Sequence, residues 1–146
     1  IGPIAKSKEK QAETGLLLGF DFGPAKIGVA AGQTETGTAS PVCTLRAVKQ
    51  RPDWEGLDRL IETWRPVALV VGLPFNMDDS EAEPAVGARR FARQLGGRYH
   101  LPVHLVDERL TSLEARRQLT RKPKKIEELD AIAAKLILET WLSEHR

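Results

Sequence analysis

The stretch Leu16-Leu-Leu-Gly-Phe-Asp-Phe22 places one carboxylate, Asp21, inside an otherwise apolar run. A short apolar run of this length is typical of a buried strand. A buried carboxylate without a partner costs several kcal/mol, so the fold has to supply one. Either the following turn and Lys26 provide that partner, or Asp21 binds a metal ion.

Outward from this strand, turns and apolar periodicity predict the other elements. Strands are expected at residues 27–32, 38–45, 67–73 and 102–106. Apolar residues at helical spacing predict helices at 54–64, from Ser80 to a stop at Gly96-Gly97, at 111–119, and across 129–141, with a loop at 120–128.

The predicted order βββαβαβαα combines an antiparallel start with later strands that alternate with helices. Such alternation favours parallel crossover connections, which are almost always right-handed. We therefore expect an α/β domain with a mixed five-stranded sheet and helices on both faces.

Length and composition limit the function classes. The chain has 146 residues, which suits one domain, and we expect a polar tail at 1–14 followed by a single domain at 15–146. One cysteine, Cys43, excludes an internal disulfide and is expected to be a small core residue. This low cysteine content fits a reducing cytosol, so we expect a cytoplasmic protein. No apolar run reaches the roughly 18 residues that span a membrane.

Two more acidic segments accompany Asp21. Asp107 and Glu108 follow the strand at 102–106, and only one of them can share the side of Asp21, because side chains alternate along a strand. The parity of the sequence does not choose between them. Asp130 opens the last helix, where it either stabilises the helix dipole or borders the inward face with Ala134 and Ile137.

Three acids drawn from two strands and one helix could bind Mg²⁺ or Mn²⁺, because these ions prefer oxygen ligands. Two such ions about 4 Å apart can activate a water and stabilise the leaving oxygen of a phosphodiester. The three histidines lack metal-ligand spacing and are interpreted as surface or structural residues; they are His100, His104 and His145.

Several motifs resemble the YqgF family of RuvC-like proteins. They are Gly19-Phe-Asp-Phe-Gly23, Lys26-Ile-Gly-Val-Ala30, Val70-Val-Gly-Leu-Pro-Phe-Asn-Met-Asp78, Val106-Asp-Glu-Arg-Leu-Thr111, Glu114-Ala-Arg116, Leu129-Asp-Ala-Ile-Ala-Ala134 and Leu136-Ile-Leu138. They stand in the family's order and cover residues 16–142. Pro24 and Ala25 depart from it, since the family usually has threonine and a basic residue there.

The resemblance implies an RNase H-like fold and a metal-dependent nuclease that processes the 5′ end of the 16S rRNA precursor. It implies Asp21, Glu108 and Asp130 as the catalytic and metal-binding acids, and so favours Glu108 over Asp107. The implied partner is RNA or branched DNA, with a monomer or weak homodimer as the assembly.

Basic residues flank these acids and are candidates for nucleic-acid binding, together with one polar residue. The candidates are Lys26, Asn76, Arg109, Arg116, Arg121, Lys122, Lys124 and Lys125. Arg89, Arg90 and Arg93 are more simply a solvated helix face.

Three other functions remain open at this point. A Holliday junction resolvase would act on DNA as a dimer, because two strands must be cut symmetrically. A binding module would recognise nucleic acid without cleaving it. An actin-like kinase is disfavoured, because that fold needs two RNase H-like halves and 146 residues supply one.

Overall fold

The computed structural model describes residues 15–23, 25–49, 51–74, 83–107 and 126–145. The strands are β1 (Leu16–Phe22), β2 (Lys26–Gln33), β3 (Thr38–Val48), β4 (Arg51–Pro52), β5 (Ala68–Leu73) and β6 (Val103–Asp107). The helices are α2 (Trp54–Trp64), α3 (Glu83–Tyr99) and α5 (Ile126–Glu144).

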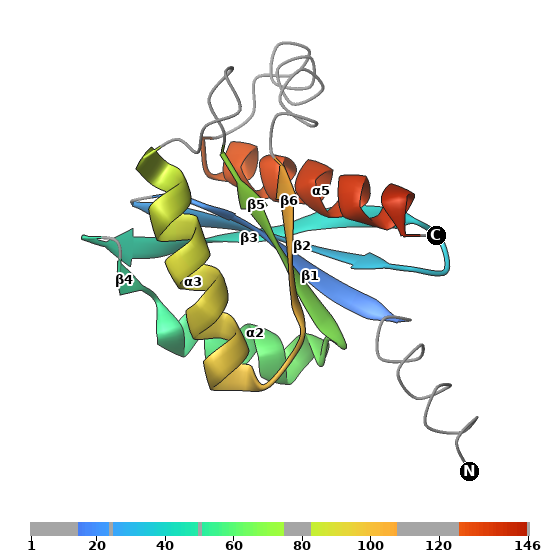
Figure 1. Cartoon of the computed structure of the whole chain (residues 1–146), viewed down its shortest axis with the longest axis horizontal. Coiled ribbons are helices and arrows are strands. Elements are labelled where there is room, and N and C mark those ends of the chain that lie inside the picture. Colours follow the sequence, from blue (N-terminus) through green and yellow to red (C-terminus); the bar gives the residue numbers. More distant parts are fainter. Residues whose placement is uncertain (1–14, 24, 50, 75–82, 108–125, 146) are drawn as a thin grey trace.

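The described strands form one mixed sheet in the order β4-β3-β2-β1-β5-β6. β1 pairs antiparallel with β2 and parallel with β5, and β5 pairs parallel with β6. Helix α5 covers one face of the sheet, while α2 and α3 cover the other (Figure 1). This confirms the predicted α/β class with helices on both faces.

The alternation of side chains along β1 feeds two separate cores. Leu18 and Phe20 are fully buried against α2 and α3, whereas Leu17 is fully buried against α5. Phe91 of α3 centres the first core: its ring lies 5.6 Å from that of Phe20 and 4.8 Å from that of Phe22. Because odd-numbered β1 residues face α5, Asp21 lies on the α5 side.

The structure corrects the predicted number of strands and two predicted helix boundaries. The sheet has six strands rather than five, because the two-residue β4 pairs with the end of β3 and is too short to leave a pattern in the sequence. Gly96-Gly97 does not end α3, which continues to Tyr99, and the chain reverses at His100 with φ 55°. Residues 126–128 belong to α5 rather than to the predicted loop.

The extension of α3 has a tertiary cause. Arg98 and Tyr99, in its last turn, bond to Asp58 of α2, and these contacts hold the turn that the two glycines weaken. The predicted helix at 111–119 and the proposed tail at 1–14 lie outside the described residues.

Candidate active site

Asp21 lies near the end of β1, half-buried, on the face that α5 covers. Its direct neighbour across the antiparallel pair is Gly28 of β2. The next strand continues this row, because Gly28 in turn pairs with Thr44 of β3. The carboxylate of Asp21 therefore lies on the face that α5 covers, beside a β2 position, Gly28, that carries no side chain.

Gly28 allows the backbone of α5 to touch the sheet beside Asp21. A Cβ atom placed on Gly28 would overlap the main-chain carbonyl of Asp130. Two turns along α5, a Cβ on Gly19 would lie 2.8 Å from the Cβ of Leu138, which is also too close. These two glycines set the approach of the helix, and Gly28 brings Asp130 to the level of Asp21.

The electrostatics of Asp130 reflect this placement. Burial raises the pKa of Asp130, the negative charge of Asp21 raises it further, and the positive charge of Lys26 opposes the shift. The structure thus brings together three of the residues that the sequence singled out, two acids and one lysine, on one face of the sheet.

Asp107 ends β6 and does not share that face. It pairs with Leu73, and Leu73 packs into the core beneath α3. Its neighbour Val106 packs instead into the core beneath α5. The register therefore places the side chain of Asp107 on the face opposite Asp21. The sequence alone left the face of Asp107 open.

Many predicted site residues lie outside the described residues. They are Asn76, Glu108, Arg109, Arg116, Arg121, Lys122, Lys124 and Lys125. Within the described ranges, no group of three or more His, Cys, Asp or Glu side chains is arranged to hold a metal ion. The described part of the site is the pair of Asp21 and Asp130, beside Lys26.

This pair suits a hard divalent cation. Both donors are carboxylates, and repulsion from Asp21 adds to the effect of burial in raising the pKa of Asp130. A cation between two such groups would remove that repulsion, and Mg²⁺ takes oxygen ligands of this kind while keeping waters in its shell. The residues present therefore fit a divalent metal ion.

The other polar residues that the sequence singled out lie elsewhere. Arg90 and Arg93 are exposed on α3, on the opposite side of the sheet from Asp130.

His104 and His145 both stack on the ring of Trp141, with centroids 4.7 Å and 4.1 Å away, in keeping with a structural role. Cys43 packs against the core beneath α2 and α3, and burial raises the pKa of its thiol.

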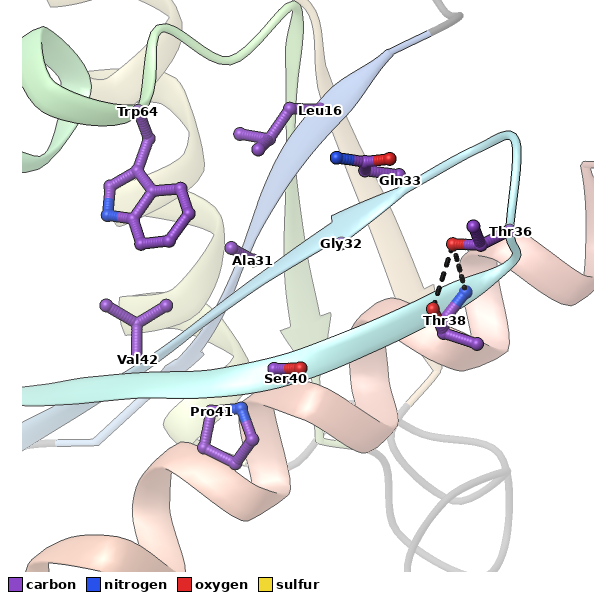
Figure 2. A pocket seen from close by; sticks show the side chains of 10 residues that line it. All are labelled: Leu16, Ala31, Gly32, Gln33, Thr36, Thr38, Ser40, Pro41, Val42 and Trp64. Atoms are coloured by element: carbon purple, nitrogen blue, oxygen red, sulfur yellow. Dashed lines mark hydrogen bonds between the residues drawn. The ribbon is translucent and has the colours of Figure 1, made fainter.

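A cavity of about 500 Å³ lies beside the start of β1, far along the strand from Asp21. Figure 2 shows Trp64 facing Leu16 and Val42 across it, and Thr36 bonded to Thr38 at its rim. None of its lining residues is charged. It therefore offers no carboxylate to a metal ion and is separate from the acidic pair.

The sequence did not single out Gly28 as a functional residue. A signal was present, because Gly28, Ala30 and Gly32 alternate as small residues along one face of β2. Such a face admits a closely packed helix.

No helix in the described part of the chain is long and apolar enough to cross a membrane.

Comparison with known proteins identifies the relatives of this arrangement. A family model described as "RuvX: Holliday junction resolvase" matches residues 15–144. A Coxiella burnetii protein named "Putative pre-16S rRNA nuclease" is 52% identical over 136 residues, covering 90% of this chain and 94% of the relative. A protein of the same name from Azotobacter vinelandii is 50% identical over 133 residues, covering 88% and 94%.

Solved structures show the same fold at low identity. The fowlpox virus Holliday junction resolvase has a TM-score of 0.54 at 13% identity, covering 88% of this chain and 99% of that one. Thermus thermophilus RuvC, solved with a Holliday junction substrate, has a TM-score of 0.50 at 18% identity, covering 84% and 92%. Both support the expected RNase H-like fold.

The relatives and the family model agree on one type of reaction, the hydrolysis of phosphodiester bonds in nucleic acid. This chain is accordingly a nuclease. It belongs to the RuvX family of RuvC-like nucleases, also called the YqgF family.

Proposed function

We propose that this nuclease processes the 5′ end of the 16S rRNA precursor in the cytoplasm, using Mg²⁺ or Mn²⁺. Asp21, Asp130 and Glu108 are the proposed metal ligands and catalytic carboxylates. The observation that supports this most is the glycine contact at Gly28, which sets Asp130 beside Asp21 on one face of the sheet. The names of the relatives from Coxiella and Azotobacter support the choice of RNA.

Each described residue has a distinct task in this proposal. Asp21, on a central strand, is a rigid ligand because β1 is paired with β2 at Asp21 and with β5 up to the preceding residue, Phe20. Asp130, on α5, closes the site from above the sheet. A divalent ion bound there would supply a Lewis acid that polarises the phosphoryl group and lowers the pKa of the attacking water.

Lys26 is the proposed phosphate contact nearest to these acids. Its positive charge acts on Asp130. A lysine beside two carboxylates limits the net negative charge that an incoming phosphodiester would meet. It thereby lowers the electrostatic barrier to substrate entry.

The test compares wild type with Asp21→Asn on a 5′-extended 16S rRNA precursor, with Mg²⁺ or Mn²⁺. We expect Asp21→Asn to reduce cleavage by about 10²-fold or more, since it removes a charged ligand from the reaction centre. Glu62→Gln, an exposed acid on the far side of the sheet, is the matched control and should cleave normally. Equal cleavage by Asp21→Asn, or no cleavage by wild type, would overturn the proposal.

A four-way DNA junction is the second substrate to test, because the family model is described as a Holliday junction resolvase. A resolvase should cut two strands symmetrically and assemble as a dimer on the junction. Our proposal is a monomer or weak homodimer acting on RNA. Preferential, paired cleavage of the junction by a stable dimer would favour DNA. Binding of either substrate without turnover would favour a non-catalytic module.

A further inference from the structure

Two basic side chains lie directly opposite each other beside the acidic pair. Lys26 begins β2, and its register partner in β3 is Arg46. Their neighbours Ile27 and Leu45 pack into or against the core beneath α2 and α3. Because side chains alternate along a strand, Lys26 and Arg46 both lie on the α5 face, the face of Asp21.

A bulge in β3 produces this alignment. Cys43 pairs with Val29, but the next β2 residue, Ala30, pairs with Pro41, so the strand carries one extra residue at Val42. Such an extra residue reverses which side chains face each side of the sheet. Without it, Arg46 would lie on the other face.

The two basic side chains repel each other, although the attraction between Lys26 and Asp130 offsets part of that repulsion. Like charges directly opposite each other in an antiparallel pair repel, with Cβ atoms about 5 Å apart. Among the described residues, no hydrogen bond or ion pair joins either side chain to an acidic group. Arg46 is exposed, so its guanidinium is free to meet an external anion.

The location relates this basic pair to the proposed chemistry. Asp21, Gly28 and Thr44 form one row across three strands. Lys26 and Arg46 lie two residues further along β2 and β3, which corresponds to about 7 Å. A nucleic-acid strand with one phosphodiester at the acids would place a neighbouring phosphate near the basic pair.

We propose that Lys26 and Arg46 form a phosphate-binding pair that holds a backbone phosphate next to the one that is hydrolysed. Hydrolysis of the phosphodiester at the acidic pair rests on the proposed function, whereas the phosphate contact of Lys26 and Arg46 does not. Arginine suits this task because its planar guanidinium can bond two phosphate oxygens at once. Arg46 is then a substrate-binding residue of the site.

The first experiment measures binding in the absence of cleavage. Fluorescence anisotropy with a labelled 5′-extended 16S rRNA precursor, with the metal chelated, gives the dissociation constant from about 50 to 200 mM salt. Arg46→Gln should lower the slope of log affinity against log salt by about 0.7–0.9, the value for one lost phosphate contact. Arg59→Gln, an exposed arginine on α2, is the matched control and should keep the wild-type slope.

The second experiment separates binding from a structural effect. Arg46→Gln should raise KM severalfold with little change in kcat and no change in the metal concentration that gives half-maximal activity. Its Tm should equal or exceed that of wild type, because the substitution removes the repulsion with Lys26. A lower Tm, an unchanged salt slope, or wild-type protein that does not bind the RNA would overturn the phosphate-binding pair.

These outcomes are distinguishable from failure of the proposed function. If wild type binds the RNA with the expected slope loss for Arg46→Gln but cleaves nothing, the proposed reaction is wrong and the phosphate-binding pair stands. If wild type cleaves and Arg46→Gln keeps both the slope and the KM, the pair is wrong and the reaction stands.

Discussion

Gly28 shows how a residue without a side chain can bring two candidate metal ligands together. The carbonyl of Asp130 occupies the space that any Cβ on Gly28 would need. Larger residues at this position would push the first turns of α5 away from the sheet. The distance between Asp21 and Asp130 therefore depends on residue 28 being a glycine.

We predict that Gly28→Ala keeps both acids and loses metal affinity. The concentration of Mg²⁺ or Mn²⁺ for half-maximal cleavage should rise about 10–100-fold, the range for changes that misplace metal ligands. Gly97→Ala on α3 is the control, since a Cβ there meets no atom within 4 Å, and it should keep the wild-type metal dependence. If Gly28→Ala keeps the wild-type metal dependence, Gly28 does not position Asp130.

The ionised carboxylate of Asp130 lowers the stability of the folded state. Burial and Asp21 raise the pKa of Asp130, so the folded chain holds this proton more tightly than the unfolded chain. Above that raised pKa, the ionised carboxyl destabilises the folded state, and this cost is absent at a pH below the unfolded value of about 3.8.

Asp130→Asn should therefore raise the Tm of the metal-free protein at neutral pH. It should also remove the increase in Tm that Mg²⁺ or Mn²⁺ gives to wild type. Differential scanning fluorimetry with and without metal measures both effects, with Glu62→Gln as the control. A Tm for Asp130→Asn below that of metal-free wild type would contradict this interpretation.

Contacts between α3 and α2 explain where α3 ends. Arg98 of α3 donates two hydrogen bonds to Asp58 of α2, at 2.9 Å and 2.8 Å, and Tyr99 donates a third at 2.6 Å. The guanidinium also lies 5.1 Å from the ring of Trp54. These bonds lower the pKa of Asp58 to about 2, with the bond from Arg98 as the largest cause.

We predict an acid-sensitive link between α2 and α3. A lowered pKa means that ionised Asp58 stabilises the fold above about pH 4, and that this contribution disappears as the pH falls towards 2. Asp58→Asn should lower Tm at pH 7, and its difference from wild type should shrink on acidification. Glu62→Gln, one turn further along α2, should show no such trend. A pH-independent difference would mean that packing, not charge, accounts for the effect.

At the scale of the whole molecule, the sheet separates a stabilising face from the acidic one. Phe91 is 1% exposed and contacts aromatic rings from β1 and α2 on the face opposite Asp21. The acidic pair and the basic pair lie on the other face, beneath or beside α5. Loss of packing around Phe91 should therefore change the free energy of unfolding more than the rate of cleavage.

Phe91→Ala tests that separation. We expect a loss of about 3–5 kcal/mol in the free energy of unfolding, from lost transfer energy and a residual cavity. The folded fraction should retain its metal dependence at low temperature. Urea denaturation and a metal titration of cleavage measure the two properties. A changed metal requirement in the folded protein would show that the two faces are coupled.

The sequence by itself determined the elements and the unusual carboxylate. Asp21 stands out because a charge interrupts a run of apolar residues, and the helices stand out because their apolar residues repeat at helical spacing. Both signals are local, so they survive without knowledge of the fold. The apolar spacing of the last helix placed Asp130 near its inward face, and the family motifs favoured Glu108 over Asp107 and supplied the expected reaction.

Only the tertiary structure decided which residues meet. The register between β1 and β2 sets Gly28 opposite Asp21, and the register between β5 and β6 turns Asp107 to the other face. The bulge at Val42 puts Arg46 on the side of Lys26. Register and bulges depend on pairing between distant segments, and one extra residue reverses every side chain beyond it, so no local pattern encodes this outcome.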